Sequence, residues 1–292
     1  MADKETIAVL GAGGTMGLAM ARNLARDGYG IRAWNRSSDK AQPLTEDGAT
    51  LCHTAAEAAQ GADVILTMLS DSDAVIAAME GEDGALAAEP GPETIWLQMS
   101  TIGEAGTERC AELARDHQVE FVDAPVLGTK QPAQEGKLVV LASGPERLRD
   151  RVSPIFNVVG QRSMWVGGAG DGSRLKLATN SWLLAIVEGA AESLAAAEGM
   201  GLDPQLLLDA VADGPLDLPY LKLKGKAMIE REFEPSFALR LAAKDAALVE
   251  EAAQRHHLDL PLVSTIRRRM EEGIPAHGDE DLSATFLTSA PA

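Results

Sequence analysis

The first half of the chain alternates short apolar, β-branched runs with longer Ala- and Leu-rich stretches. The runs predict strands at 7–10, 30–34, 63–69, 94–99, 120–123 and 137–142, with helical patterns between most of them, the first at 15–27. Such alternation is typical of a parallel sheet with helices on both faces. We therefore expect an α/β fold with a doubly wound parallel sheet, which short strands near 160–166 close.

The pattern changes after Gly172, beyond which the sequence shows no convincing strand. One long apolar helix is expected at roughly 173–199, followed by shorter helices. The prolines at their starts and stops are Pro204, Pro215, Pro219, Pro235 and Pro261. We place the domain boundary in the glycine-rich stretch near 167–172. The predicted domains are an α/β domain at 1–168 and an all-α domain at 169–292, linked by the long helix.

The acidic balance of the chain, with a formal net charge of -18, disfavours partners that need a basic surface. Nucleic acid and membranes are therefore not expected as partners, and we interpret the charge as a solubility feature. The two cysteines, Cys52 and Cys110, form no CxxC pair, so neither a disulfide framework nor a metal site is predicted. Because no signal peptide or membrane-spanning run is recognised, a cytoplasmic location is expected.

A glycine-rich segment follows the first predicted strand and opens the first predicted helix. Its residues are Gly11, Ala12, Gly13, Gly14, Thr15, Met16 and Gly17. Glycines at such a turn let backbone N–H groups approach a pyrophosphate, and the helix N-terminus adds a favourable dipole. This position favours a dinucleotide-binding loop over a simple turn. The spacing leaves two registers open: a loop with one extra residue after Gly11 and Gly13, or a hexamer from Ala12 to Gly17.

The end of the second predicted strand indicates which dinucleotide is bound. NAD enzymes usually carry Asp or Glu here to hold the ribose 2′-OH, but this chain reads Asn35, Arg36 and Ser37. A guanidinium can bind phosphate through two parallel hydrogen bonds, so the segment suits a 2′-phosphate. The alternative is that Arg36 is a solvated loop residue. We predict NADP as the cofactor, with NAD as the alternative.

The long helix carries Lys176 and Asn180 in a segment that is apolar on nearly every side. Such a helix is expected to be buried, and residues four apart share one face. A buried lysine is costly without a partner or a task, and burial lowers a lysine pKa, which suits proton transfer near neutral pH. The alternative is that Lys176 reaches solvent, and the segment alone does not decide. Lys244 and Asp245 also interrupt an apolar helix, where such a pair is most often solvated.

Taken together, these segments resemble the β-hydroxyacid dehydrogenase family at five places in order along nearly the whole chain. The places are 13–17 with Met20, Asn23 and Leu24; 67–69; 99–102; 123–128 with 136–138; and Gly170, Gly172, Lys176 and Asn180, followed by 244–245. Each motif is modest alone, but the ordered set is specific. It favours the catalytic interpretation of Lys176.

The resemblance implies a Rossmann domain, one long interdomain helix and an all-α domain that forms dimers or tetramers. It implies that Lys176 is the catalytic acid and base and that Asn180 helps to position it and the substrate. Lys244, next to Asp245, is implied to reach the cofactor and substrate. The strand-end residues implied to line the nicotinamide are Met68, Leu69 and Thr101.

One departure from the family concerns the substrate. The family usually reads Asp-Ala-Pro-Val-Ser-Gly-Gly, whose serine and glycines bind the substrate carboxylate, whereas this chain has Leu127, Gly128 and Thr129 there. The Leu127 side chain has no hydrogen-bond donor. Backbone N–H groups, Thr129 or Lys130 are alternative partners for a carboxylate, and a less polar substrate is a further alternative. The stretch 128–133 is most similar to the glyoxylate/succinic semialdehyde reductase branch.

We therefore expect hydride transfer between NADPH and a small aldehyde, semialdehyde or β-hydroxyacid, with Lys176 as acid and base. Imine reduction is the alternative, because related reductases share this architecture and Leu127 is apolar, although they generally lack the lysine. A non-catalytic cofactor-binding module ranks last because this chain keeps Lys176. The expected partners are the small-molecule substrate and further copies of the chain, in a homodimer or homotetramer.

Overall fold

The computed structural model describes residues 4–290, and the chain divides into two compact units, Met1–Lys176 and Leu177–Ala292. The division falls within the long helix α7 (Asp171–Gly199), whereas the sequence places the domain boundary at 168/169. The helix therefore contributes its first turns to one unit and the remainder to the other. No helix within residues 4–290 is long and apolar enough to cross a membrane.

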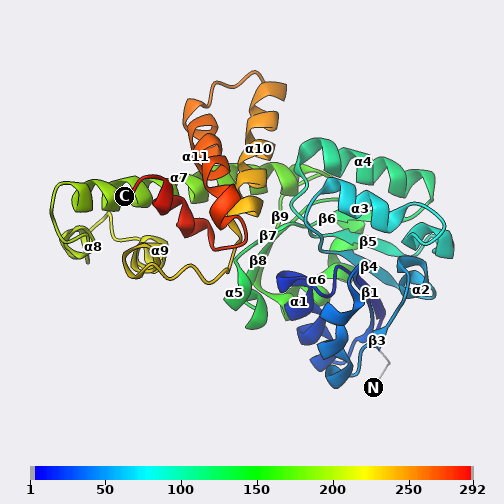
Figure 1. The fold of residues 1–292 in the computed structure, drawn as a ribbon. Helices are drawn as coiled ribbons and strands as arrows, with labels where there is room; N and C mark the ends of the chain where they lie inside the picture. Colours follow the sequence, from blue (N-terminus) through cyan, green and yellow to red (C-terminus); the bar gives the residue numbers. More distant parts are fainter. Residues whose placement is uncertain (1–3, 291–292) are drawn as a thin grey trace. The chain divides into compact units, whose positions relative to one another are not determined.

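The first unit is built on a six-stranded parallel sheet in the order β3-β2-β1-β4-β5-β6 (Figure 1). Its strands are β1 (Thr6–Leu10), β2 (Gly30–Trp34), β3 (Thr50–Leu51), β4 (Val64–Thr67), β5 (Ile95–Gln98) and β6 (Glu120–Asp123). Alternate residues of β1 join different hydrophobic clusters: Ile7 and Val9 lie in one, and Ala8 and Leu10 in the other. Both faces are therefore covered, which confirms the doubly wound parallel sheet.

Helices of the first unit cover the two faces of this sheet. One face packs against α1 (Thr15–Arg26) and α6 (Arg149–Val159). The other packs against α2 (Ala55–Ala59), α3 (Ser72–Met79) and α4 (Gly103–Asp116). The remaining short helices are η1 (Ser38–Lys40), η2 (Gln42–Asp47), η3 (Ala85–Ala88), α5 (Lys130–Gln134) and η4 (Glu146–Leu148).

The strand register aligns the carboxyl ends of the sheet. Leu10 pairs with Trp34 and with Thr67. Thr67 pairs with Gln98, which in turn pairs with Asp123. The loops that follow these strands therefore leave the sheet at one edge, which is the edge where ligands bind in open α/β sheets.

The predicted extension of the parallel sheet by 137–142 and 160–166 is wrong. These segments form β8 (Leu138–Ala142) and β9 (Gly160–Trp165) of a separate three-stranded sheet in the order β7-β8-β9. The physical reason is β7 (Val126–Leu127), which follows β6 and pairs antiparallel with β8. Since β9 pairs in parallel with the other edge of β8, no edge of β8 is left for the main sheet.

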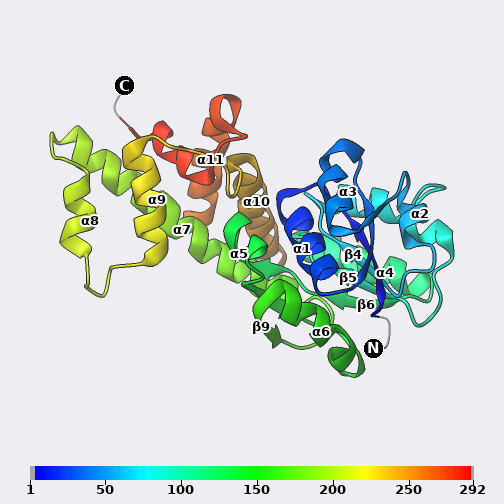
Figure 2. The same cartoon turned by 90° about the horizontal axis from the view of Figure 1, so that it is seen from below.

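The described part of the second unit contains helices and no named strand. They are the rest of α7, α8 (Gln205–Val211), α9 (Pro219–Glu230), α10 (Leu239–Arg255), α11 (Pro261–His277) and η5 (Leu282–Thr288). Pro219 and Pro261 occupy the first turns of their helices, where a missing N–H does no harm. Figure 2 shows α8 and α9 side by side.

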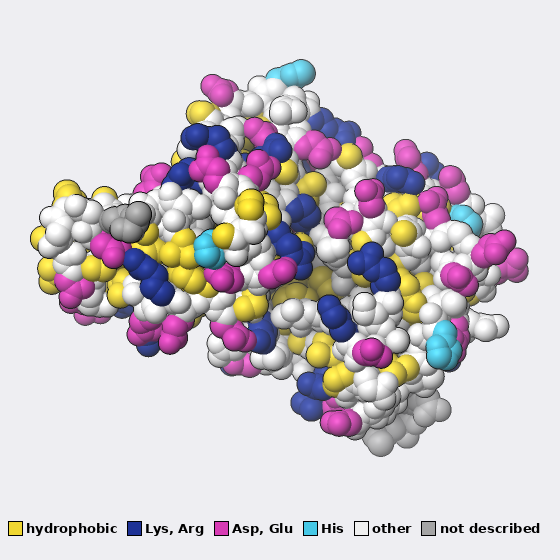
Figure 3. Space-filling model, in the orientation of Figure 1, with side chains coloured by type: hydrophobic (Ala, Val, Ile, Leu, Met, Phe, Trp, Pro, Cys, Tyr) yellow, Lys and Arg dark blue, Asp and Glu magenta, His cyan; other side chains and the backbone are white. Residues whose placement is uncertain are grey.

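Within one chain, the long helix is buried along one side. Leu184, Val187 and Leu194 enter the core of the second unit, but 65% of the Trp182 surface is exposed. One side of the helix packs into the core of the second unit. The other side stays exposed although it carries apolar residues. Further exposed apolar side chains lie in and near α8 and α9: Met200, Leu202, Leu206, Leu216 and Leu223. Figure 3 shows hydrophobic side chains in yellow at the surface of this part of the chain.

Candidate active site

The glycine-rich segment forms the turn between β1 and α1. Gly11 has a φ of +95°, and a Cβ there would lie 2.2 Å from the carbonyl oxygen of Met68. A Cβ on Gly17 would lie 2.2 Å from the carbonyl oxygen of Gly11, so this glycine lets α1 pack against the loop. Because Gly11 makes the tight turn and Gly17 the close helix contact, the geometry favours the register with one extra residue.

The start of α1 is open to an anion. Within the described residues, no side chain caps this helix after Gly14, and its first turn holds no acidic residue. The first N–H groups of a helix need acceptors and carry partial positive charge. The turn formed by Thr15, Met16 and Gly17 therefore suits a pyrophosphate.

The three residues predicted to select NADP follow β2, and the structure separates their roles. Asn35 Oδ1 accepts a hydrogen bond from Gly13 N at 3.2 Å, and Asn35 Nδ2 donates to Ser37 O at 2.9 Å. Asn35 thus joins the glycine loop to the loop after β2. Arg36 and Ser37 are exposed, and nothing in the range 4–290 forms a hydrogen bond or ion pair with the Arg36 guanidinium.

Arg36 also lines a pocket of the first unit that sequence reasoning missed. Trp34, His53 and Thr54 also line it, and three acidic residues that follow α3 complete the lining: Glu80, Glu82 and Asp83. The Trp34 ring and the Arg36 guanidinium suit the purine and the 2′-phosphate of an adenosine, whereas the three carboxylates would repel a phosphate. No sequence pattern linked these residues, because they come from three separate loops.

Lys40 is a second cation near the glycine loop that sequence reasoning missed. A Cβ on Gly13 would lie 2.6 Å from Lys40 Cβ, so η1 packs directly against the loop. The available signal was a basic residue shortly after Arg36 on the same predicted loop. Lys40 therefore joins the candidates for phosphate binding.

The residues predicted to line the nicotinamide lie at the carboxyl edge of the sheet. A Cβ on Gly11 would meet Met68 O at 2.2 Å and Leu69 Cδ2 at 3.0 Å, so both residues contact the glycine loop. Leu69 N donates to Ser100 Oγ at 2.9 Å, which joins the ends of β4 and β5. Thr101 follows directly, so the structure brings all three predicted residues to adjoining loops.

Lys176 lies on the second turn of α7, and only 8% of its surface is exposed. Its burial argues against the alternative that the side chain reaches solvent. Asn180 follows one turn later and is 1% exposed. Among the described residues, no donor reaches the buried Asn180 Oδ1. Since buried acceptors normally receive a hydrogen bond, this atom suits a ligand group.

Lys244 and Asp245 are not the solvated pair expected from sequence alone. Asp245 is buried, and its Oδ2 accepts a hydrogen bond from Asn180 Nδ2 at 2.7 Å. Lys244 Nζ lies 2.9 Å from Asp245 Oδ1. The second unit therefore brings together three predicted site residues, with Asp245 holding the Asn180 amide in one orientation.

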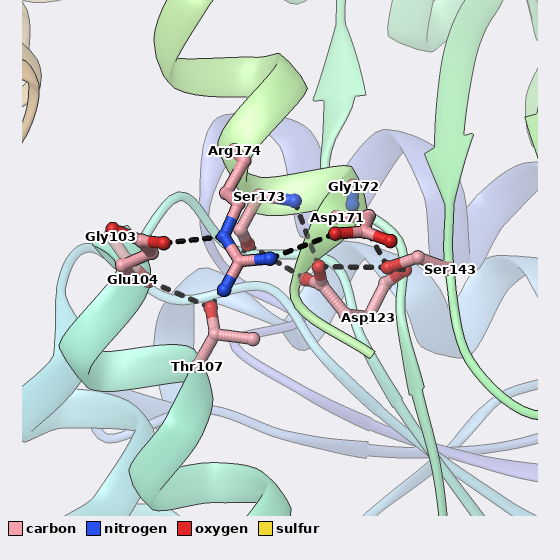
Figure 4. A network of polar contacts seen from close by, with 9 residues as sticks. All are labelled: Gly103, Glu104, Thr107, Asp123, Ser143, Asp171, Gly172, Ser173 and Arg174. Atoms are coloured by element: carbon pink, nitrogen blue, oxygen red, sulfur yellow. Dashed lines mark hydrogen bonds and ion pairs between the residues drawn. The ribbon is translucent and has the colours of Figure 1, made fainter. Parts of the chain in front are cut away.

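Another buried carboxylate meets the start of α7 in the first unit (Figure 4). Asp123, the last residue of β6, accepts hydrogen bonds from Ser173 N and Ser173 Oγ, each at 2.8 Å. Ser143 Oγ lies 3.1 Å from the same carboxylate. Burial raises the pKa of Asp123 to about 6, although these hydrogen bonds oppose the shift. The sequence motif contained Asp123, but no role was predicted for it.

The segment that departs from the family pattern forms β7 and the turn into α5. Leu127 is half-buried on β7. Gly128 has a φ of +122°, a backbone conformation that L side chains rarely adopt, so the turn favours glycine. Thr129 precedes α5 without capping it by a side-chain hydrogen bond in the described structure.

Two family profiles match the chain in succession. The profile described as the NAD binding domain of 6-phosphogluconate dehydrogenase matches residues 6–167. The profile described as NAD-binding of NADP-dependent 3-hydroxyisobutyrate dehydrogenase matches residues 170–287. Together they span the sheet of the first unit, α7 and most of the helices of the second unit.

Curated relatives and a solved structure are similar over nearly the full chain. Glyoxylate/succinic semialdehyde reductase 1 of Arabidopsis thaliana is 30% identical, with 94% of each chain covered. The 2-hydroxy-3-oxopropionate reductase of Escherichia coli is 32% identical, with 95% of this chain and 94% of the relative covered. The structure of Mycobacterium tuberculosis 3-hydroxyisobutyrate dehydrogenase with L-serine has a TM-score of 0.87 at 28% identity, and covers 98% of this chain and 99% of that one.

Proposed function

Because the chain belongs to the β-hydroxyacid dehydrogenase family of NAD(P)-dependent oxidoreductases, we propose that Lys176 is the acid and base of hydride transfer between NADPH and a small carbonyl compound. The observation that carries the proposal is the buried lysine on α7, one turn before an asparagine whose buried Oδ1 receives no hydrogen bond from residues 4–290. Lysine is one of the side chains that transfer protons in enzymes when they are positioned at the reacting group.

The glycine loop of the first unit has features that suit a dinucleotide. Gly11 and Gly17 leave no room for a Cβ, and the uncapped start of α1 offers N–H groups to a pyrophosphate. Arg36 and Ser37 would hold the 2′-phosphate, and the bound NADPH would supply the hydride. We expect NADPH to bind more tightly than NADH for this reason.

Lys176 performs the proton transfer in this proposal. As hydride reaches the carbonyl carbon, negative charge develops on the oxygen, and the Lys176 ammonium donates a proton to it. In the reverse direction the neutral amine accepts the proton of the hydroxyl group. Asn180 orients the reacting oxygen or the lysine, because Asp245 accepts from its Nδ2 and leaves its Oδ1 available. Lys244 stays a predicted contact to cofactor and substrate.

The substrate class proposed is a small aldehyde or semialdehyde, or a β-hydroxyacid. The curated relatives are named for glyoxylate, succinic semialdehyde and 2-hydroxy-3-oxopropionate, which all combine an aldehyde with a carboxylate. Leu127 offers no side-chain donor to such a carboxylate. Backbone N–H groups beside Gly128, the Thr129 hydroxyl or Lys130 would then hold it.

We also propose that the protein assembles as a homodimer or homotetramer. The support is the set of exposed apolar side chains in and near α8 and α9, together with the exposed Trp182. A small helical unit leaves such a surface uncovered by itself. The cytoplasmic location stays a prediction.

A spectrophotometric screen tests the proposed function. NADPH oxidation would be followed at fixed enzyme concentration with glyoxylate, succinic semialdehyde, 2-keto acids and a cyclic imine. Turnover of an aldehyde that is lost in Lys176→Ala and not restored in Lys176→Arg supports the proposal, since guanidinium does not release its proton at neutral pH. Turnover of the imine alone would favour imine reduction. NADPH binding without any turnover would favour a non-catalytic module.

A further inference from the structure

The start of α7 is held by side chains from distant strands and not by a local cap. Gly172 N donates to Ser143 Oγ at 2.9 Å, and Ser173 N donates to Asp123 Oδ2 at 2.8 Å. The neighbouring N–H groups of Asp171 and Arg174 donate to the carbonyls of Gly168 and Gly170. The first turn of the helix thus has all its N–H groups bonded, and its side-chain acceptors come from the ends of β6 and β8.

Packing fixes the position of this turn as closely as its hydrogen bonds do. A Cβ on Gly172 would lie 2.3 Å from Leu141 O and 3.2 Å from Asp123 O, so the backbone of α7 rests directly on both strand ends. Asp123, Ser143 and Ser173 are buried, and Thr107 Oγ1 of α4 lies 2.9 Å from Ser173 Oγ. The turn cannot shift without breaking several buried polar contacts.

Ser173 and Lys176 lie three residues apart on α7, which makes them neighbours on the helix surface. In a regular α-helix the N–H of residue 176 bonds to the carbonyl of residue 172. The backbone position of Lys176 therefore depends on Gly172 and Ser173. Ser143 and Asp123 accept the hydrogen bonds of these two N–H groups. Both Ser173 and Lys176 are buried.

We propose that Asp123 is a positioning residue for Lys176, because its carboxylate and Ser143 fix the first turn of α7 on the sheet. This inference rests on the proposed acid and base role of Lys176. A carboxylate suits the site because a helix N-terminus stabilises negative charge, and α7 is the longest helix of the described chain. Small displacements of a catalytic group can reduce turnover by about 10²-fold.

The proposal predicts a pH dependence with a definite sign. The pKa of Asp123 is raised by burial to about 6, so acidification protonates it and weakens its bonds to Ser173. The facing titratable group on α4 is Cys110, whose pKa is raised to about 12 by burial and by Asp123, so it stays neutral. The charged groups nearby are Arg174, Glu104 on α4 and Asp171 on α7. The Arg174 guanidinium forms an ion pair with each of the two carboxylates. Turnover should fall as the pH drops through the pKa of Asp123.

The test compares Asp123→Asn and Ser143→Ala with Asp47→Asn. Asp47 is a carboxylate of the same unit held by Arg22 and Arg26, outside the proposed site. Steady-state kcat and KM for the best aldehyde would be measured between about pH 5 and about pH 8, with NADPH affinity from fluorescence titration.

We expect Asp123→Asn to lower kcat by about tenfold to about hundredfold, to leave NADPH affinity unchanged and to lose the acidic limb of the pH profile. Ser143→Ala should lower kcat by less and keep that limb, and Asp47→Asn should change neither. If Asp123→Asn has the kcat and the acidic limb of the wild type, and Lys176→Ala abolishes turnover, this inference is overturned but the proposed function is not. Near-normal turnover of Lys176→Ala would instead overturn the proposed function. If Asp123→Asn does not fold, an acidic limb in the wild type and a kcat loss in Ser143→Ala support the inference, and their joint absence refutes it.

Discussion

A buried ion pair in the second unit allows a stability prediction from the structure. Lys224 Nζ lies 2.7 Å and 2.9 Å from the two carboxylate oxygens of Asp281, and the two side chains are only 5% and 4% exposed. Asp281 also accepts hydrogen bonds from Ser236 and Ser283, through the backbone N–H and the hydroxyl of each. The pair therefore joins α9, the segment before α10 and the start of η5.

Replacing Lys224 with Met should destabilise the second unit strongly. The substitution preserves most of the side-chain volume but leaves the Asp281 carboxylate buried without its countercharge. Breaking a buried pair in this way typically costs about 3–5 kcal/mol. We expect the lower end, about 3 kcal/mol, because the donors of Ser236 and Ser283 remain. The matched control is Lys226→Met on the same helix, whose exposed pair with Glu230 is worth about 0–1 kcal/mol.

The effect should depend on pH with a known sign. Burial raises the pKa of Asp281, but the charge and hydrogen bond of Lys224 and the hydrogen bonds of Ser283 together outweigh burial, so the net pKa is lowered. A lowered folded-state pKa gives stability that is fully present above the unfolded value of about 3.9 and is lost as pH falls through the folded pKa. The difference in the free energy of unfolding between the wild type and Lys224→Met should therefore become smaller at acidic pH.

Urea unfolding followed by circular dichroism measures these free energies. An unfolding free energy of Lys224→Met within about 1 kcal/mol of the wild type at neutral pH would refute the reasoning. Equal decreases in the free energy of unfolding for Lys224→Met and Lys226→Met would refute it as well, because the reasoning attributes the larger effect to the burial of Lys224.

Three further predictions concern the cofactor, the start of α7 and assembly. Arg36→Ala should weaken NADPH binding about tenfold or more and leave NADH binding unchanged, since a charge-assisted bond contributes about 1.5–3 kcal/mol; calorimetric titration that finds equal affinities in the wild type would contradict this. Gly172→Ala should lower both the melting temperature and turnover because its Cβ would meet Leu141 O, whereas Gly189→Ala on the same helix, with open space around it, should stabilise by about 0.4–1 kcal/mol. Analytical ultracentrifugation should show a dimer or tetramer at micromolar concentration, and a monomer there would refute the proposed assembly.

Local patterns in the sequence were sufficient to predict much of the fold. The main sheet follows from strands whose length and spacing show in the sequence, and α7 follows from a long apolar run. The error at 137–142 arose because β7 is too short to leave a sequence signal, yet its antiparallel pairing decides which sheet β8 joins. Sequence periodicity also could not indicate which side of α7 packs into the core of the second unit, so the exposure of Trp182 was not predicted.

In the candidate site, too, residues close together in sequence could be predicted, whereas contacts between distant segments could not. The glycine loop and Arg36 lie on one strand–turn–helix segment, so spacing alone indicated them. Asp123, Ser143 and Ser173 meet through three elements that are far apart in sequence, and no spacing rule connects them. The partner of Asn180 was likewise hidden, because a contact between α7 and α10 depends on tertiary packing.

The central claim is that Lys176 transfers the proton, and its most direct test is the turnover of Lys176→Ala with NADPH and the best aldehyde substrate. Parallel titration of NADPH separates a chemical defect from a binding defect. The proposal predicts that kcat falls by about 10²–10⁴-fold while NADPH affinity stays at the wild-type value. Turnover of Lys176→Ala close to the wild type, with a folded protein and intact NADPH binding, would contradict it.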